Sequence, residues 1–535
     1  TVRRNAGATV PLHHRTALRH QPLYYSTTAR WCDCTSVGET MKKSVIIVFL
    51  LALVAPFAGQ AQSIEQALDL YKQKEYPDAA KALYTVVFEH PDPDTRDQAQ
   101  IYLAESLFKL KYYNSALFYY NELFMVGRSN RYYLNAVEGL LKIQEELHDP
   151  LVIPTALSAN FDGEGFNQLD PTKGAQISYL VGDLSYRQGR NSLAREYLDF
   201  VPPESSYYSK ARYLLGLIDI RSNNAEAALQ YFQEILDHIP EDSVFNEQRR
   251  VRNLSLLAMG RALYGLARYK EASEYFLQVP RFTQHWFSSM YENAWSWYQQ
   301  EDYGRALGEL HSTTSPYFDK THIPETYVIQ GTAYFVNCQW DRVRRSITQY
   351  NGTYPQMRKD LEAYLGDLPE PAQVYRDIVD GGNDKYPLEI AREIRKTKRF
   401  RDYYHMMEYL TWEANAVSTE ERIAGTRFGE DLKAFIQDQR AQLEPVIGGW
   451  VTNQIKNRLA SLKNFQNQMD TLDLELSIAE TSWLDERREI SKGWRARLPR
   501  PEIPNDQWQH WEFHKEYWKG ELGYYHHAIG NECDL

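Results

Sequence analysis

Residues 216–228 read Gly216-Leu-Ile-Asp-Ile-Arg-Ser-Asn-Asn-Ala-Glu-Ala-Ala228, and Phe232 and Pro240 follow them. A small residue, a polar turn and an alanine twelve positions after the small residue predict two helices joined by a tight turn. Small residues where the two helices cross allow their axes to approach closely, and Phe232 is expected to fill the seam with the next unit. Pro240 is expected to end the second helix.

The same pattern returns six more times between residues 60 and 356. The other copies start at Ala67, Ala104, Gly182, Gly260, Ala294 and Gly331. The starts at 182 and 216, and those at 260 and 294, are 34 residues apart, and in this period the chain resembles tetratricopeptide repeat (TPR) proteins. The resemblance implies an all-α, TPR-like helical solenoid, whose stacked units supply the core that no single unit can bury. It also implies a protein that binds other proteins and is not an enzyme.

The breaker residues and the changes in pattern divide the chain into segments. We expect upstream sequence outside the native protein at 1–40, a signal peptide at 41–61, TPR-like repeats 1 and 2 at 62–147, a loop or degenerate repeat at 148–175, TPR-like repeats 3 to 7 at 176–356, a connector at 357–387, a long helical region at 388–498, and a Pro-rich linker with an aromatic tail at 499–535.

Residues 41–61 have the features of a secretory signal peptide. Lys42 and Lys43 precede an apolar run at 45–54, and Gly59-Gln60-Ala61 offers a cleavage site. A membrane anchor is the rival interpretation, but the run is short for a bilayer and Pro56 ends it. With cleavage there, residues 1–40 are sequence translated in error or an organelle-type leader. We therefore expect a periplasmic location, with outer-membrane or peptidoglycan association as an option.

The charge balance disfavours a nucleic-acid partner. The chain carries 60 Lys and Arg residues against 71 Asp and Glu residues, a net charge of −11, whereas nucleic acids select basic surfaces. After signal cleavage only Cys338 and Cys533 remain. In an oxidising compartment they either form a disulfide or remain as two unpaired thiols.

Downstream of the repeats, apolar residues recur at steps of three and four. The pattern predicts a helix from 388 to about 440, an interruption at Pro445 and Gly448-Gly449, and then a longer helix. The stripe of the longer helix consists of Ile455, Leu459, Leu462, Phe465, Met469, Leu472, Leu476, Ala479 and Trp483. It is either a coiled-coil arm for oligomerisation or docking, or a face that packs on residues 388–440 of the same chain.

The C-terminal tail is rich in aromatic residues, which need something to bury them. They are Trp508, Trp511, Phe513, Tyr517, Trp518, Tyr524 and Tyr525. We expect the tail to dock onto the solenoid, held there by a Cys338–Cys533 bond. The alternative is an aromatic surface for another protein or for a glycan strand.

Candidate chemistry is sparse. His510 and His514 would share one face of a helix, but the sequence lacks the glutamate of a His-Glu-x-x-His site. Glu105-Ser106 matches the Glu-Ser pair of lytic transglycosylases only in those two residues. We therefore predict no metal, no cofactor and no catalytic residues.

A partner surface is predicted on the concave face of the solenoid. In the family that the chain resembles, the residue four positions after the signature Gly or Ala lies there. These positions, with two arginines one residue further on, give the candidate groove Tyr71, Phe108, Tyr186, Arg187, Arg221, Tyr264, Tyr298 and Phe335. Rigid aromatic rings suit a peptide or helix, and the arginines suit acidic partner groups.

Two further segments are similar to repeat proteins of myxobacterial and related envelopes, some of which belong to gliding-motility machinery. They are Asn337-Cys338-Gln339-Trp340 and the tail from Trp511 to Tyr524. The expected function is a non-enzymatic protein–protein interaction scaffold of a periplasmic or outer-membrane-associated complex, in motility or envelope assembly. The alternative is a peptidoglycan- or glycan-binding envelope protein that uses the aromatic tail.

Overall fold

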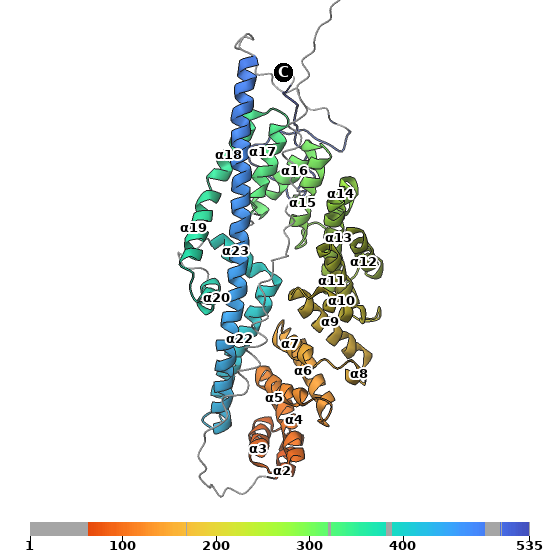
Figure 1. Cartoon of the computed structure of the whole chain (residues 1–535), viewed down its shortest axis with the longest axis vertical. Coiled ribbons are helices and arrows are strands. Elements are labelled where there is room, and N and C mark those ends of the chain that lie inside the picture. The colour runs from red at the N-terminus through yellow and green to blue at the C-terminus, as the bar shows by residue number, and fades with distance from the viewer. Residues whose placement is uncertain are drawn as a thin grey trace, which may run out of the picture.

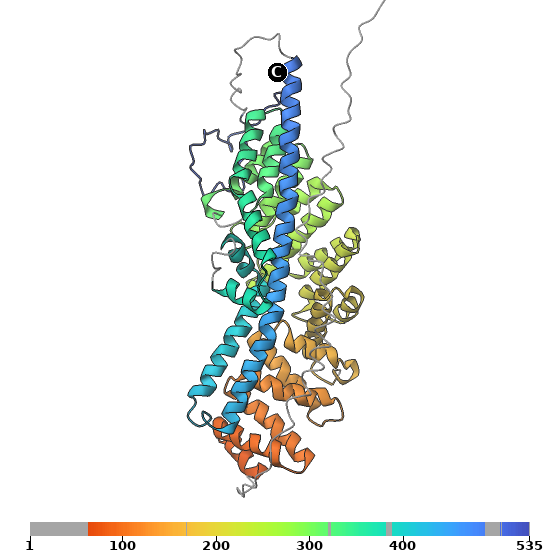
Figure 2. The same cartoon turned by 60° about the vertical axis from the view of Figure 1, so that its left-hand side comes forward.

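The computed structural model describes residues 63–166, 168–318, 323–380, 388–486, 503 and 505–533, with only the backbone at 483–486. These residues form an all-α, TPR-like solenoid with a long helix beside it (Figures 1 and 2). The predicted upstream sequence at 1–40, the signal peptide at 41–61 and nearly all of the Pro-rich linker lie outside the described residues. No helix in the described ranges is both long and apolar enough to span a bilayer.

Each of the seven repeat matches is an antiparallel pair of helices. The pairs are α2 (Ile64–Lys72) with α3 (Tyr76–Glu89), α4 (Pro93–Lys109) with α5 (Tyr113–Val126), α9 (Pro171–Arg187) with α10 (Asn191–Asp199), α11 (Tyr208–Arg221) with α12 (Ala225–His238), α13 (Asn246–Gly265) with α14 (Tyr269–Leu277), α15 (Trp286–Gln299) with α16 (Tyr303–Thr313), and α17 (Glu325–Phe335) with α18 (Trp340–Asn351). A short 3-10 helix, η2 (Pro316–Phe318), follows α16.

The turn inside each repeat has one conformation. Its left-handed residue, always seven positions after the signature small residue, is Lys74, Lys111, Gly189, Asn223, Ala267, Glu301 or Cys338, with φ between 56° and 74°. Six of the seven are not glycine, although this region is strained for side chains with a Cβ. The packing of the two helices therefore dictates the turn.

The signature glycines lie where the helices of a pair cross. A Cβ added to Gly216 would lie 2.5 Å from the Phe232 ring, and one on Gly260 would lie 2.5 Å from Phe276. The aromatic residue of the second helix occupies the space that the glycine leaves, and both phenylalanines are buried. The spacing in the sequence predicts this packing correctly.

Residues 148–175, predicted as a loop or a degenerate repeat, contain helices. Helix α6 (Tyr133–Leu147) is followed by α7 (Val152–Ala159) and the single turn α8 (Gly163–Phe166). The buried carboxylate of Asp149 accepts hydrogen bonds from the backbone N–H groups of Leu151, Val152 and Ile153, which begin α7.

The predicted connector 357–387 is also helical where it is described. It contains most of α19 (Tyr354–Gly366) and all of α20 (Pro371–Val379). Pro355 and Pro371 are in the first turns of these helices, where the missing N–H costs little. The prolines therefore mark helix starts rather than a loop. Gly381 and Gly382 of the predicted connector lie outside the described residues.

The predicted interruption at Pro445 and Gly448-Gly449 is wrong. After α21 (Leu388–Lys396) and α22 (Lys398–Thr419), one helix, α23 (Arg427–Glu486), runs for 60 residues, or about 90 Å. Gly448 is a packing site: a Cβ there would lie 1.6 Å from the carbonyl oxygen of Pro371 at the start of α20. Packing along both sides of Pro445 keeps the helix continuous despite the lost backbone hydrogen bond.

The apolar stripe of α23 packs within the chain, but mainly on a different segment from the one predicted. Its buried residues from Ile455 to Leu476 share a core with α18 and α19, and Leu472 lies against Gly331 of α17. Ion pairs from Lys463 to Glu362 of α19 and from Glu480 to Arg344 of α18 flank the stripe. The side chain of Trp483 lies outside the described part.

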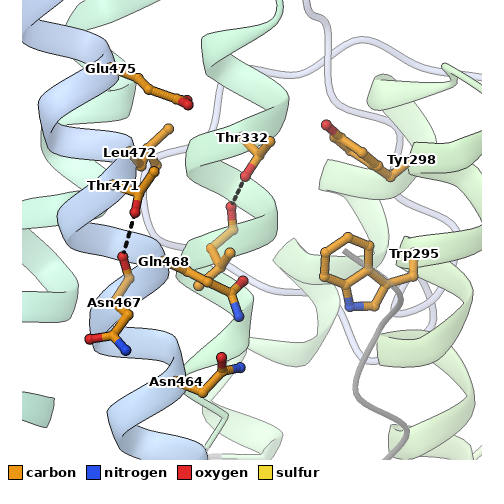
Figure 3. Close-up of a pocket in the computed structure, with 10 residues that line it drawn as sticks. Trp295, Tyr298, Thr332, Asn464, Asn467, Gln468, Thr471, Leu472 and Glu475 are labelled. Carbon is orange, nitrogen blue, oxygen red and sulfur yellow. Dashed lines mark hydrogen bonds between the residues drawn. The ribbon is translucent and has the colours of Figure 1, made fainter. Parts of the chain in front are cut away.

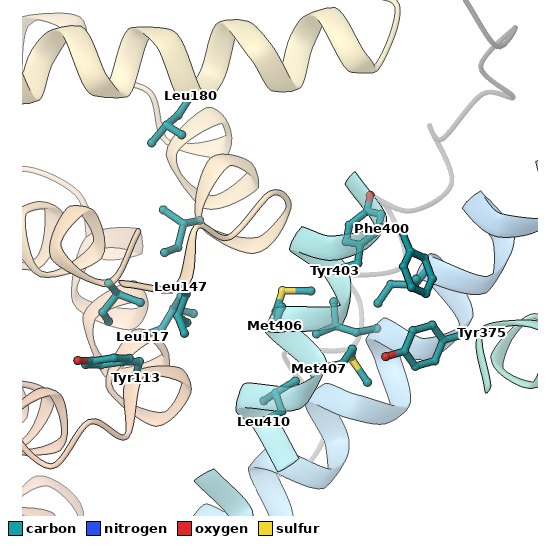
Figure 4. Close-up of a cluster of buried hydrophobic side chains, with 14 of the residues drawn as sticks. Tyr113, Leu117, Leu147, Leu180, Tyr375, Phe400, Tyr403, Met406, Met407 and Leu410 are labelled. Carbon is teal, nitrogen blue, oxygen red and sulfur yellow. The ribbon is translucent and has the colours of Figure 1, made fainter. Parts of the chain in front are cut away.

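The first half of α23 and helix α22 reach back to the first repeats. We call these two helices and their loop, residues 398–486, the closing hairpin. Phe428 packs on Tyr84 of α3, and Phe435 packs on Phe118 of α5. Helix α22 directs Met406 toward the first repeats and Met407 to the opposite side, toward Tyr375 of α20 (Figure 4). The closing hairpin therefore connects the start of the repeat array with its end.

Candidate functional site

Most of the predicted groove aromatics pack against another aromatic ring of their own repeat. Five of them contact the first residue of the helix that follows. The pairs are Tyr71–Tyr76, Phe108–Tyr113, Tyr264–Tyr269, Tyr298–Tyr303 and Phe335–Trp340, with ring centroids 5.1–5.7 Å apart. The two aromatic residues of each pair are five positions apart in the sequence, one on each side of the left-handed turn. This spacing is the signal for the ring contact, and the sequence analysis did not use it.

The two predicted arginines also make contacts within the chain. Arg187 donates a hydrogen bond to the carbonyl oxygen of Pro150 at 2.6 Å and pairs with Asp183 at 2.8 Å. Arg221 lies 3.8 Å over the ring of Tyr186 and donates to the carbonyl oxygen of that residue at 3.1 Å. Both guanidinium groups tie neighbouring repeats together, so the structure does not offer them to an acidic partner as the sequence analysis expected.

Of the predicted groove residues, Tyr298 lines a pocket of about 160 Å³. The pocket lies between α15, α17 and the C-terminal half of α23 (Figure 3). Its lining is Trp295, Tyr298, Val328, Thr332, Asn464, Asn467, Gln468, Thr471, Leu472 and Glu475. The repeats supply aromatic and apolar walls, and α23 supplies the polar wall.

The aromatic wall is held firmly in place. The indole N–H of Trp295 donates to Glu325 at 3.0 Å, and its ring meets Tyr298 edge to face at 5.8 Å. Glu325 is buried, which raises its pKa to about 8 and keeps it protonated at neutral pH. Burial raises the pKa of Tyr298 as well. The wall is therefore neutral at neutral pH.

The polar wall consists of amides and hydroxyls beside the apolar stripe. Asn464, Gln468 and Thr471 follow one side of α23 at steps of three and four residues. The amide nitrogen of Asn464 is buried and has no hydrogen-bond partner among the described residues. The sequence analysis concentrated on the stripe itself, whereas amides at regular spacing along its edge were the available signal.

A second feature is the docked tail. Leu522 is fully buried with Trp286 and Met290, and Arg281 donates to the carbonyl oxygens of Gly520 and Leu522 at 2.8 and 2.9 Å. Cys533 forms a disulfide with Cys338. The tail thus crosses repeats 5 to 7, the docking that the sequence analysis expected.

Two glycines of α16 make room for the tail backbone. A Cβ on Gly308 would lie 1.8 Å from the carbonyl oxygen of Tyr525, and the carbonyl oxygen of Gly304 accepts from the backbone N–H of His527 at 2.9 Å. The sequence analysis did not single out either glycine.

The tail histidines are arranged differently from what their spacing predicts. The described tail contains no helix, so His510 and His514 do not share a helical face. His527 contacts Arg342 at 2.7 Å, and His514 lies 3.8 Å from Glu516. Across the described ranges, no three His, Cys, Asp or Glu side chains gather in a way that would hold a metal ion.

Comparison with known proteins gives distant structural likenesses. No family model matches the sequence, and no curated protein matches it. A solved TPR protein from Parabacteroides merdae is 16% identical, with 55% of this chain and 93% of that chain covered and a TM-score of 0.25. The apo form of the quorum sensor NprR from B. thuringiensis is 13% identical, with 70% and 97% covered and a TM-score of 0.29.

Proposed function

We propose that the protein is a non-enzymatic scaffold that holds an extended segment of a partner protein in the pocket between α15, α17 and α23. The observation that carries the proposal is the pairing of an aromatic wall, Trp295 and Tyr298, with an amide wall, Asn464 and Gln468. Aromatic rings contact apolar parts of a partner with little entropy cost, and amides both donate to and accept from a peptide backbone.

The pocket suits binding better than catalysis. Glu475 is the only carboxylate in its lining, and no His, Lys, Cys or Ser accompanies it. The hydroxyls of Thr332 and Thr471 donate to carbonyl oxygens of their own helices. General acid–base or nucleophilic chemistry needs at least two groups that act together. The volume of about 160 Å³ accommodates one long side chain and its peptide group, so the partner would enter as an extended segment.

We place the scaffold in the periplasm, as part of an outer-membrane-associated complex. The proposal rests on the signal-peptide pattern at 41–61 and on the Cys338–Cys533 disulfide, a bond typical of oxidising compartments. A role in motility or envelope assembly rests on the similarity of two segments to myxobacterial envelope proteins. The disulfide joins the first of these segments to Cys533, nine residues after the end of the second.

The test is affinity co-purification of the tagged full chain from gently solubilised envelopes, followed by mass spectrometry. Asn464→Ala with Gln468→Ala is expected to lose partners that the unaltered chain retains in near-stoichiometric amounts. The matched control is Asn457→Ala, an exposed amide on the same helix outside the pocket. Partners recovered equally with all three proteins would exclude the pocket as their site.

Glycan binding is a second candidate because part of the tail presents aromatic rings to solvent. Trp508, Phe513, Trp518 and Tyr524 are 41%, 45%, 49% and 58% exposed. Such rings can stack on sugar faces. Pelleting with purified sacculi tests this function: Trp508→Ala with Trp518→Ala should abolish pelleting, while Trp412→Ala, an exposed tryptophan on α22, should retain it.

A further inference from the structure

The lining of the α15–α17–α23 pocket contains an acidic side chain and no basic one. Its lining contains the carboxylate of Glu475 and no Lys, Arg or His. Two cations of α23 and α18 are engaged elsewhere, since Lys463 pairs with Glu362 and Arg344 pairs with Glu480. Glu325 behind Trp295 adds no charge at neutral pH, because burial raises its pKa to about 8. A bound positive group would therefore meet one carboxylate and no repulsion from the lining.

The aromatic side chains strengthen this preference. Tyr298 lies across the pocket from Glu475, and Trp295 lies beside Tyr298 (Figure 3). A cation between a carboxylate and aromatic faces gains both Coulomb and cation–π attraction, and the partial burial of the site reduces screening. An acidic group would meet repulsion from Glu475 at the same place.

The opposite end of the pocket selects a hydrogen-bond acceptor. The buried amide nitrogen of Asn464 has no partner among the described residues, so a ligand oxygen that reaches it would satisfy a donor that is costly to leave unpaired. Gln468 lies between this end and Glu475 and offers a second amide (Figure 3). A ligand that fits both ends has a positive group near a carbonyl oxygen.

We propose that the pocket recognises a basic side chain, arginine or lysine, within an extended peptide segment. Glu475, Tyr298 and Trp295 would contact the positive group, and Asn464 would donate to a backbone carbonyl oxygen beside it. This inference rests on the proposed function, because it names the chemistry of the partner segment at the same pocket.

The test uses the full chain labelled with 5-fluorotryptophan and read by fluorine NMR. The Trp295 resonance is assigned by its loss in Trp295→Phe. The probes are the peptides acetyl-Gly-Ala-X-Ala-Gly-amide, in which X is arginine, lysine, citrulline or glutamate. Citrulline keeps the shape of arginine without its charge.

We expect the arginine and lysine peptides to shift the Trp295 resonance and to bind at least about fivefold more tightly than the citrulline peptide, as expected for a partly exposed ion pair with cation–π support. Glu475→Gln should remove that ratio. Asp473→Asn, an exposed acid on the same helix outside the pocket lining, should keep it.

Two results would overturn the inference and leave the scaffold proposal standing. These are equal affinity for all four peptides at Trp295, or a preference for the basic peptides that survives Glu475→Gln. If none of the peptides shifts the Trp295 resonance, the inference fails. Only partner recovery that is insensitive to Asn464→Ala with Gln468→Ala would remove the proposed function of the pocket as well.

Discussion

The backbone N–H of Ser115 donates a hydrogen bond of 2.8 Å to the carboxylate of Glu413, 298 residues further along the chain. The Ser115 hydroxyl donates to the same oxygen at 2.6 Å, and the backbone and side chain of Asn114 donate to the other oxygen at 2.9 and 3.0 Å. Glu413 of α22 is fully buried and satisfies the free N–H groups at the start of α5. One carboxylate therefore fastens the closing hairpin to the second repeat.

Glu413→Ala is expected to destabilise this junction by about 2–4 kcal/mol, because it leaves buried donors at the start of α5 unpaired. Glu413→Gln should cost less, since one acceptor oxygen remains. Hydrogen exchange should show faster exchange in α5 and α22. Asn415→Ala, an exposed neighbour on α22, should behave like the unaltered chain, and equal protection in Glu413→Ala would contradict the assignment.

Gly448→Ala should disrupt the crossing of α20 and α23, because its Cβ would lie 1.6 Å from the carbonyl oxygen of Pro371. We expect a loss of several kcal/mol in the free energy of unfolding, as for other overpacked sites. The adjacent Gly449 has nothing within 4 Å of an added Cβ. Gly449→Ala should raise stability by up to about 1 kcal/mol through helix propensity. Thermal or denaturant unfolding of the two variants makes the comparison, and equal effects would refute the close contact.

Gly308→Ala should displace the tail from α16, since its Cβ would overlap the carbonyl oxygen of Tyr525. The measurement is hydrogen exchange at His527, whose N–H donates to Gly304. Gly174→Ala on α9, which has nothing within 4 Å, is the control. Unchanged protection of the tail in Gly308→Ala would show that the Tyr525 backbone does not lie this close to α16.

Cys533→Ser should loosen the end of the tail. The disulfide closes a loop with a sequence separation of 195 residues, worth up to ~5 kcal/mol in the chain-entropy model. Exchange at the Glu532 N–H, which donates to the carbonyl oxygen of Asn337 at 3.0 Å, should speed up. Leu522 should remain protected longer, because its burial does not depend on the bond. Mass spectrometry of peptides prepared without reductant gives the independent check, and two free thiols would contradict the bond.

The stability of repeats 6 and 7 should fall as pH rises. Glu309 and Glu325 are buried, which raises the pKa of each from 4.5 to about 8. Between these two pH values the folded chain keeps protons that the unfolded chain releases, so the free energy of unfolding decreases with pH. Glu309→Gln should reduce the slope of the melting temperature against pH from 5 to 8. Glu274→Gln, an exposed acid on α14, should leave it unchanged. An unchanged slope in Glu309→Gln would rule out this carboxyl as a source.

The sequence predicted the repeats well because their signal is local. A glycine such as Gly216 and its partner Phe232 are sixteen residues apart and meet inside one helix pair, so their spacing carries the geometry. The contacts that close the array are different: Ser115 and Glu413, or Gly331 and Leu472, have no spacing rule that links them. The continuity of α23 through Pro445 depends on such long-range packing, and for that reason the local breaker rule failed there.

The candidate site was predicted only in part for the same reason. Tyr298 could be identified from its position in a repeat, but the opposite wall with Asn464 and Gln468 comes from a helix more than a hundred residues away. The remaining predicted aromatics, such as Tyr264, lie at the turn positions that the motif defines. There Tyr71, Phe108, Tyr264 and Phe335 pack on a neighbouring ring, a partner that the sequence analysis did not consider.

The contacts of the closing hairpin at both ends of the array have a mechanical consequence. An open stack of helix pairs bends and stretches by small rotations summed over its units, as a spring does. Here a single helix of about 90 Å spans from α3 to α18, so a force that separates the ends acts along that helix before it can change the curvature. Proteins that bind near the first and last repeats would therefore be held at a constant separation.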